Sequence, residues 1–224
     1  FNDPRVNIDV LSKPFISNGY KEKGQYTFEK KHLNAKHFEL EGHEEAPRVF
    51  ISQLKVEDFS EYLQNTVKNI IDNIPENVLK SEELVFSGHV WGKPSYEVYN
   101  KLRDESEYAA WLYVFGFRAN HFTVSANALE KYPNLEDVNQ LLKDNGFKLN
   151  DSGGEIKGTP EQLLQQSSIM ADHTEVEFAE GKYTIPACYY EFAKRFHDKN
   201  GNLFSGFIAK SADKIFESTD YYKK

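Results

Sequence analysis

The sequence predicts an α+β protein made of two strand-rich modules with helices inserted between them. Some stretches carry apolar residues at helical spacing, whereas others are short runs of aromatic and β-branched residues that are typical of strands. The pattern Asn18-Gly19-Tyr20-Lys21 recurs as Asn145-Gly146-Phe147-Lys148, each time after an amphipathic helix and before strand-rich sequence. This recurrence predicts a duplicated module in which a helix is followed by strands.

Module one is expected over residues 1–56. It begins with a helix over residues 6–18, which Pro14 would kink and Gly19 would end by adopting a left-handed conformation. Three strands should follow, at residues 25–28, 37–40 and 49–54. The spacing between the two Asn-Gly copies places the counterpart of a strand predicted at 117–126 upstream of Phe1. We therefore expect module one to lack its first strand in this sequence.

The rest of the chain completes a single domain of 1–224. A helical insertion is expected over 57–115 and module two over 116–210. The predicted elements of these regions are helices at 57–73, 95–115 and 135–145, a strand at 117–126, a hairpin of 175–178 with 183–196 around Glu180-Gly181, and a turn at Asn200-Gly201. A short C-terminal helix is predicted over 211–224.

The composition excludes several classes of protein. The 224 residues include 39% hydrophobic and 14% aromatic residues, which is enough apolar material for a folded core. There are 27 Lys and Arg against 35 Asp and Glu, and the net charge of −8 disfavours a nucleic-acid partner. No apolar run is long enough to span a membrane, and the single Cys188 excludes intramolecular disulfides and thiolate clusters. We expect a cytoplasmic protein without a nucleic-acid or membrane partner; the sequence carries no signal for an oligomeric state.

His121 is the first candidate functional residue. It lies in the strand predicted at 117–126, on the face that it shares with Thr123 and Ser125. A histidine in this place serves as a metal ligand, as an acid–base group, or as a structural residue satisfied by a neighbour. These readings stay open on the sequence.

Glu191 is the second candidate, within the apolar run Tyr189-Tyr190-Glu191-Phe192-Ala193. A carboxylate inside a buried strand is costly unless it is paired or binds a metal. The alternatives are that its face is the solvent face, or that Lys194 or Arg195 pairs with it.

Arg118 is a candidate for substrate binding. It precedes His121 by three residues and would point to the opposite face of a regular strand, unless a bulge near Gly116 changes this. Its guanidinium could clamp a substrate carboxylate with two hydrogen bonds, or form a structural salt bridge. His32, His37 and His43 lie in charged, turn-rich sequence and are expected to be solvated.

Several long stretches resemble one family of enzymes. They are FNDPRVNID, KGQYTFEKKHLNAKHFE, APRVFISQL, GFRANHFTVSAN, SSIMADHTEVEF and IPACYYEFAKRF. Together they cover most of the chain and resemble the 2-oxoadipate dioxygenase/decarboxylase family, formerly called domain of unknown function 1338. The resemblance implies a vicinal-oxygen-chelate-like fold whose paired modules form a curved mixed sheet. It also implies Fe(II) held by two histidines and one glutamate.

The resemblance extends to individual residues. The second histidine of the family matches His121 in Asn-His-Phe-Thr, and its glutamate matches Glu191 in Tyr-Glu-Phe. The first histidine belongs to an Asp-His-x-x-x-Arg-Thr stretch directly before Phe-Asn-Asp-Pro-Arg. We therefore expect one metal ligand and one substrate-binding arginine upstream of Phe1, and weak metal binding without turnover from a chain that begins there.

The implied reaction uses O2 to decarboxylate a small 2-oxo acid and hydroxylate the remaining fragment, as from 2-oxoadipate to 2-hydroxyglutarate. Two other functions compete with it. One is a metal-dependent isomerase or lyase of glyoxalase type, in which Zn, Ni or Mn acts as a Lewis acid. The other is a small-molecule binding module without a working catalytic site. A fold alone does not choose among them.

Overall fold

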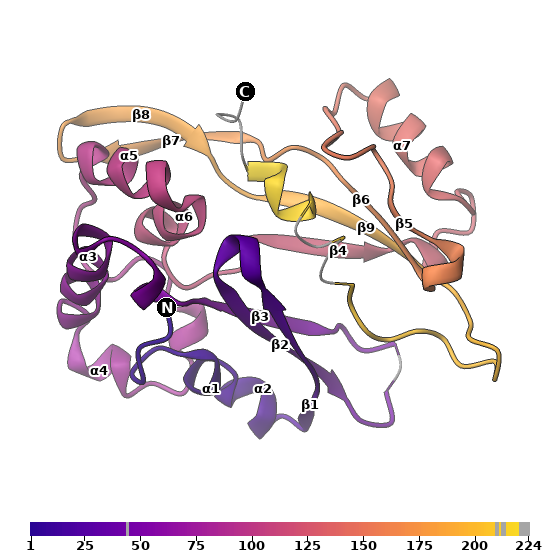
Figure 1. Cartoon of the computed structure of the whole chain (residues 1–224), viewed down its shortest axis with the longest axis horizontal. Helices are drawn as coiled ribbons and strands as arrows, with labels where there is room; N and C mark the ends of the chain where they lie inside the picture. The colour runs from indigo at the N-terminus through magenta and orange to yellow at the C-terminus, as the bar shows by residue number, and fades with distance from the viewer. Residues whose placement is uncertain (44, 209–210, 212–213, 220–224) are drawn as a thin grey trace. The chain divides into compact units, whose positions relative to one another are not determined.

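The computed structural model describes residues 1–43, 45–208, 211 and 214–219, and Figure 1 shows the chain. Its contacts divide it into two compact units. Unit 1 comprises Phe1–Arg118 with Val176–Tyr183, and unit 2 comprises Ala119–Glu175 with Thr184–Lys224. Helices and several sheets are both present, so the predicted α+β class is confirmed. The module boundaries derived from the sequence stay a prediction.

Unit 1 contains an antiparallel sheet of three strands in the order β1-β2-β3. The strands are β1 (Tyr20–Phe28), β2 (Leu33–Leu40) and β3 (Val49–Leu54). All three predicted strands are present; β3 has the predicted bounds and the other two are longer. Side chains alternate between the faces, so the register that pairs His37 with Phe50 puts both on one face.

Two predicted helices of unit 1 are each broken by a serine. The helix expected over 6–18 is α1 (Ile8–Leu11) followed by α2 (Lys13–Ser17). Pro14 lies in the first turn of α2, where its missing N–H costs nothing. The helix expected over 95–115 is α5 (Tyr96–Glu105) followed by α6 (Glu107–Phe115), because Ser106 is extended and caps α6.

Two further helices complete unit 1. α3 (Glu61–Asp72) begins later than predicted because the Ser60 side chain accepts the Leu63 N–H as an N-cap. It ends before Pro75, and α4 (Glu76–Leu79) follows. Leu63 of α3 is completely buried, so α3 contributes to the core.

A hairpin of β7 (His173–Phe178) and β8 (Gly181–Pro186) contributes its tip to unit 1. The Glu180 carboxylate in this tip accepts the Tyr96 N–H at 2.7 Å and the Ser95 hydroxyl at 2.5 Å. These bonds at the start of α5 lower the pKa of Glu180 to about 2. The predicted hairpin is confirmed, but the strand expected over 183–196 is wrong, since β8 ends at Pro186 and a new strand begins at Tyr189.

Unit 2 contains a mixed sheet in the order β4-β9-β6-β5. β4 (His121–Ser125) runs parallel to β9 (Tyr189–Arg195), and β9 runs antiparallel to β6 (Leu164–Ser168). β5 (Lys157–Thr159) pairs with β6. The sequence did not indicate β5 and β6, and β4 is shorter than expected. The predicted helix at 135–145 is present as α7 (Leu135–Asp144).

One helix of each unit, α2 in unit 1 and α7 in unit 2, ends in the same way. α2 is followed by Asn18-Gly19 and α7 by Asn145-Gly146, with φ of 91° and 83° at the two glycines. The amide side chains of Asn18 and Asn145 donate to the carbonyls of Pro14 and Leu141 at 2.7 and 2.9 Å. Both ends therefore use a left-handed glycine to release the chain into the following loop or strand.

The path repeats again before β2 in unit 1 and before β6 in unit 2. His32 and Leu163 have φ of 52° and 64°, which is unusual outside glycine. The His32 carbonyl accepts the Lys55 N–H at 2.9 Å, and the Leu163 carbonyl accepts the Phe196 N–H at 3.1 Å. β2 and β6 each begin at the next residue, so the strands of the two units share a register.

The described part of the C-terminal tail covers residues 211 and 214–219, with a helical turn at Phe216–Thr219. The other residues of the helix predicted over 211–224 lie outside the described part. Within the described residues, every helix is too short or too polar to cross a bilayer.

Candidate functional site

His121 and Glu191 meet on one face of the sheet in unit 2. Parallel pairing of β4 with β9 puts His121 opposite Tyr189 and Thr123 opposite Glu191. Residues two apart on a strand share a face, so the register brings the imidazole and the carboxylate together. His121 Nε2 lies 3.4 Å from Glu191 Oε2.

Glu191 is buried, with 3% of its surface exposed. Gln166 Nε2 donates to its Oε1 at 2.6 Å, and the Thr123 hydroxyl donates to its Oε2 at 3.3 Å. Glu191 therefore does not lie on the solvent face.

The neighbouring cations do not pair with Glu191. The Arg195 guanidinium donates to the carbonyls of Phe204 and Gly206, and the Lys194 ammonium lies over the Phe196 ring. Among the described residues, Glu191 therefore forms no ion pair with Lys194 or Arg195. The groups next to its carboxylate are an amide, a hydroxyl and an imidazole.

The imidazole of His121 is held on two sides. Its ring stacks on Tyr189, with centroids 4.6 Å apart and planes 13° from parallel. Its Nδ1 lies 3.3 Å from the Asn120 Oδ1, and 22% of its side chain is exposed. Burial, with the nearby Glu191 charge, raises the pKa of Tyr189 well above its usual value, so this ring stays neutral.

The donor set fits two ligands of one metal ion. An imidazole nitrogen and a carboxylate oxygen each about 2.1 Å from an ion, at a right angle, are about 3 Å apart, close to the observed separation. Two polar atoms on this face, Gln166 Oε1 and Tyr189 Oη, are buried without a hydrogen-bond partner. The described residues contain no group of three His, Cys, Asp or Glu side chains that could hold an ion.

Arg118 precedes β4 rather than lying on it. Gly116 has φ of 71°, and a β-carbon there would come within 2.1 Å of the Gly88 carbonyl oxygen, so the chain turns sharply before Arg118. The exposed guanidinium lies 5.9 Å from the centre of the Phe115 ring. No carboxylate of the described residues pairs with it, so the salt-bridge alternative is not realised there.

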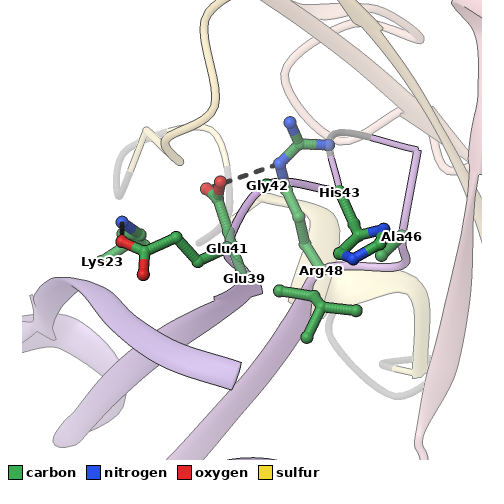
Figure 2. Close-up of a pocket in the computed structure, with 8 residues that line it drawn as sticks. Lys23, Glu39, Glu41, Gly42, His43, Ala46 and Arg48 are labelled. Carbon is green, nitrogen blue, oxygen red and sulfur yellow. Dashed lines mark ion pairs between the residues drawn. The ribbon is translucent and has the colours of Figure 1, made fainter. Parts of the chain in front are cut away.

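A separate cavity of about 110 Å³ lies in unit 1 near the β2–β3 connection (Figure 2). Glu39 and Arg48 form an ion pair at 3.6 Å across it, and Lys23 and Glu41 form another at 3.7 Å. The charges lining it balance one another. His43, on its rim, is exposed as expected from the sequence.

His37 was expected to be solvated, but only 2% of its surface is exposed, so this prediction is wrong. Its Nδ1 lies 2.9 Å from the Tyr26 hydroxyl and its Nε2 lies 3.0 Å from Glu39 Oε1. The charged neighbour Lys36 misled the prediction, because adjacent residues of β2 face opposite sides of the sheet. Glu39 lies on the same face as His37 and is its partner. Both ring nitrogens of His37 are therefore occupied by protein partners.

The sequence profile of the 2-oxoadipate dioxygenase/decarboxylase family matches residues 5–199. The chain belongs to this family. Two plant relatives carry the same name: one from Oryza sativa subsp. japonica, 35% identical over 95% of this chain, and one from Arabidopsis thaliana, 34% identical over 95%. The chain spans 65% and 64% of the lengths of these relatives.

Solved structures of other proteins share the fold. The hydroxyglutarate synthase of Oryza sativa, in complex with 2-oxoadipate, matches with a TM-score of 0.88 and 33% identity, over 99% of this chain and 78% of that one. A protein of Shewanella frigidimarina NCIMB 400, provisionally named a hydrolase, matches with a TM-score of 0.87 and 49% identity, over 93% and 82%.

A more distant structure supports the fold alone. A protein of Ralstonia eutropha JMP134, provisionally assigned to the glyoxalase superfamily, matches with a TM-score of 0.68 and 18% identity, over 89% and 67%. Together with the mixed sheet, these neighbours confirm the expected fold class. Sequence reasoning found His121 and Glu191, but it missed Gln166 and Tyr189 as their partners.

Proposed function

We propose that the protein containing this chain is an Fe(II)-dependent oxygenase that converts a small 2-oxo dicarboxylate, such as 2-oxoadipate, to a 2-hydroxy acid, here 2-hydroxyglutarate. The observation that carries the proposal is the buried Glu191 carboxylate facing His121 Nε2 at 3.4 Å. Burying a carboxylate that has no Lys or Arg partner costs free energy, and a bound metal ion would offset this cost. The family membership and the names of the plant relatives point to the same substrate.

In this proposal His121 and Glu191 supply two of the protein ligands. The family resemblance implies a second histidine as the third ligand. A two-histidine, one-carboxylate set leaves open positions on Fe(II), and the ion would supply the binding of the 2-oxo acid and the chemistry of O2. The overall reaction balances: 2-oxoadipate and O2 give 2-hydroxyglutarate and CO2.

The residues of this chain orient the site. Tyr189 fixes the plane of the His121 ring by stacking on it, and Gln166 and Thr123 hold the Glu191 carboxylate. Burial of Glu191 keeps competing water away from its ligand oxygen. Arg118, exposed and without an ion pair among the described residues, is proposed to bind a carboxylate of the substrate. A cytoplasmic location and the absence of nucleic-acid and membrane partners stay predictions, and the two plant relatives carry chloroplastic in their names.

Oxygen consumption tests the proposal. The full-length protein, loaded with Fe(II) without air and then given 2-oxoadipate and O2, should consume O2 and release an equal amount of CO2, with 2-hydroxyglutarate found by chromatography. Bound metal without oxygen uptake would support the glyoxalase-type isomerase or lyase instead. A protein that binds no metal would support the non-catalytic binding module.

A further inference from the structure

Gln166 is the closest polar neighbour of Glu191. It lies in β6 opposite Ala193, and two positions along the same face from Glu191 on the paired strand. Its side chain is 2% exposed, and its Nε2 donates to Glu191 Oε1 at 2.6 Å. It is the shorter of the two hydrogen bonds that the Glu191 carboxylate accepts from Gln166 and Thr123.

The orientation of the Gln166 amide follows from its partner. An amide turned the other way would bring its oxygen against a carboxylate oxygen, and neither atom carries a proton to donate. The nitrogen must therefore face Glu191, which leaves Gln166 Oε1 buried without a partner. The hydrogen bond to Glu191 therefore comes with one buried oxygen that has no hydrogen-bond partner.

The two oxygens of Glu191 have different surroundings. Oε1 is taken by Gln166, whereas Oε2 faces His121 at 3.4 Å and accepts only the longer bond from Thr123. Only Oε2 is thus directed toward the imidazole nitrogen.

Unit 1 provides an internal control for this arrangement. Counting from the left-handed residues His32 and Leu163, Ala35 takes the place of Gln166. Phe50, which pairs with His37, takes the place of Glu191, which pairs with Ser168. Unit 1 therefore has neither the carboxylate nor the amide at the positions that match Glu191 and Gln166.

We propose that Gln166 is a positioning residue that restricts Glu191 to binding the metal through Oε2 alone. The proposal rests on the proposed function in that it requires a metal at His121 and Glu191, whichever reaction follows. By holding Oε1, the amide prevents the carboxylate from rotating and from chelating the ion with both oxygens. Partners of this kind typically change metal affinity by about 10- to 100-fold when they are removed.

The test compares Gln166→Met with Gln165→Met in the full-length protein. Methionine is close to glutamine in length but donates no hydrogen bond. Gln165 is the neighbour on the same strand, is half-buried, and points to the opposite face. The measurements are the affinity for Fe(II) and Co(II) by competition with a coloured chelator, the visible absorption of the Co(II) form, and the melting temperature of the metal-free protein.

Gln166→Met should bind metal about 10- to 100-fold more weakly than Gln165→Met and should change the Co(II) absorption bands, because Glu191 becomes free to chelate. Equal affinity and equal spectra for the two variants would overturn the proposal. A lower melting temperature with unchanged metal affinity would also overturn it, since Gln166 would then be structural only. If the methionine variant does not fold, Gln166→Asn keeps an amide but is too short to reach Glu191, and the same affinity loss is expected.

Failure of the proposed function would look different. A wild-type protein that binds no metal contradicts the metal site itself. A wild-type protein that binds metal as tightly as Gln166→Met contradicts only the role of Gln166.

Discussion

The sheets of unit 1 and unit 2 follow one backbone path but carry different side chains at matching positions. In both, a helix ends at Asn-Gly, and a later strand, β2 or β6, begins directly after a left-handed residue. Phe50 in unit 1 takes the place of Glu191 in unit 2, and His37 takes the place of Ser168. The repeated backbone thus fixes where a side chain stands and not what chemistry it performs.

The comparison also separates a buried histidine, His37, from a half-buried one, His121. His37 has protein partners on both ring nitrogens, namely Tyr26 and Glu39. His121 Nε2 faces the carboxylate of Glu191, whose other partners are the neutral donors Gln166 and Thr123. The two histidines thus differ in burial, with 3% and 22% of their side chains exposed, and in the distance from Nε2 to the carboxylate oxygen, 3.0 Å and 3.4 Å.

The largest effect is expected from Glu191→Gln. The amide retains an oxygen for Gln166 to donate to, so the melting temperature of the metal-free protein should change little, whereas metal content and turnover should be lost with the charge. Glu191→Ala should lose the metal as well and cost about 1–3 kcal/mol of stability, because Gln166 Nε2 is left without an acceptor. Metal analysis and melting of the apo protein check this; retained iron and turnover in Glu191→Gln would remove Glu191 from the site.

A smaller effect is expected from His37→Phe. The ring fits the buried position in shape, but the Tyr26 hydroxyl and the Glu39 carboxylate each lose a partner. Stability should fall by about 1–3 kcal/mol, with metal content unchanged. Denaturant unfolding and metal analysis measure both quantities, and loss of metal from this variant would mean that the two histidine environments are not distinct in function.

The smallest effect concerns the β7–β8 hairpin, which unit 2 inserts between β6 and β9 where unit 1 has a short connection. The pKa of Glu180 falls from 4.5 to about 2 on folding, so its contribution to stability is present above pH 4.5 and is lost as the pH falls toward 2. In Glu180→Gln the melting temperature should therefore fall less between pH 6 and pH 3, taken as roughly either side of the ordinary carboxyl pKa. Parallel melting curves for the two proteins over this range would contradict the assignment.

The sequence predicted the elements whose signals are local. β3 has the expected bounds because its apolar run is short and bounded by Pro47, and α7 ends at the expected Asn145-Gly146. The break at Ser106 was not predicted, because apolar spacing continues through it and only the cap geometry interrupts the helix. The break at Ser12 lies two residues before Pro14, where the sequence predicted a kink.

Only part of the candidate site was predicted, and the reason is physical. His121 and Glu191 were found through the family resemblance and the cost of burying a carboxylate. Gln166 was missed because Gln-Gln-Ser-Ser reads as solvent-exposed sequence. The burial of β6 depends on pairing with β9 across the intervening hairpin, which no local pattern encodes.

The stacking of His121 on Tyr189 has a consequence for the entropy of ligand capture. A free side chain loses rotamer freedom when it is fixed, at a cost on the order of 1 kcal/mol. The His121 ring is already held by Tyr189 and Asn120, so its rotamer entropy is lost when the protein folds and not when an ion binds. The apo protein is correspondingly less stable than its contacts suggest, and the imidazole is preorganised for its ligand before that ligand is present.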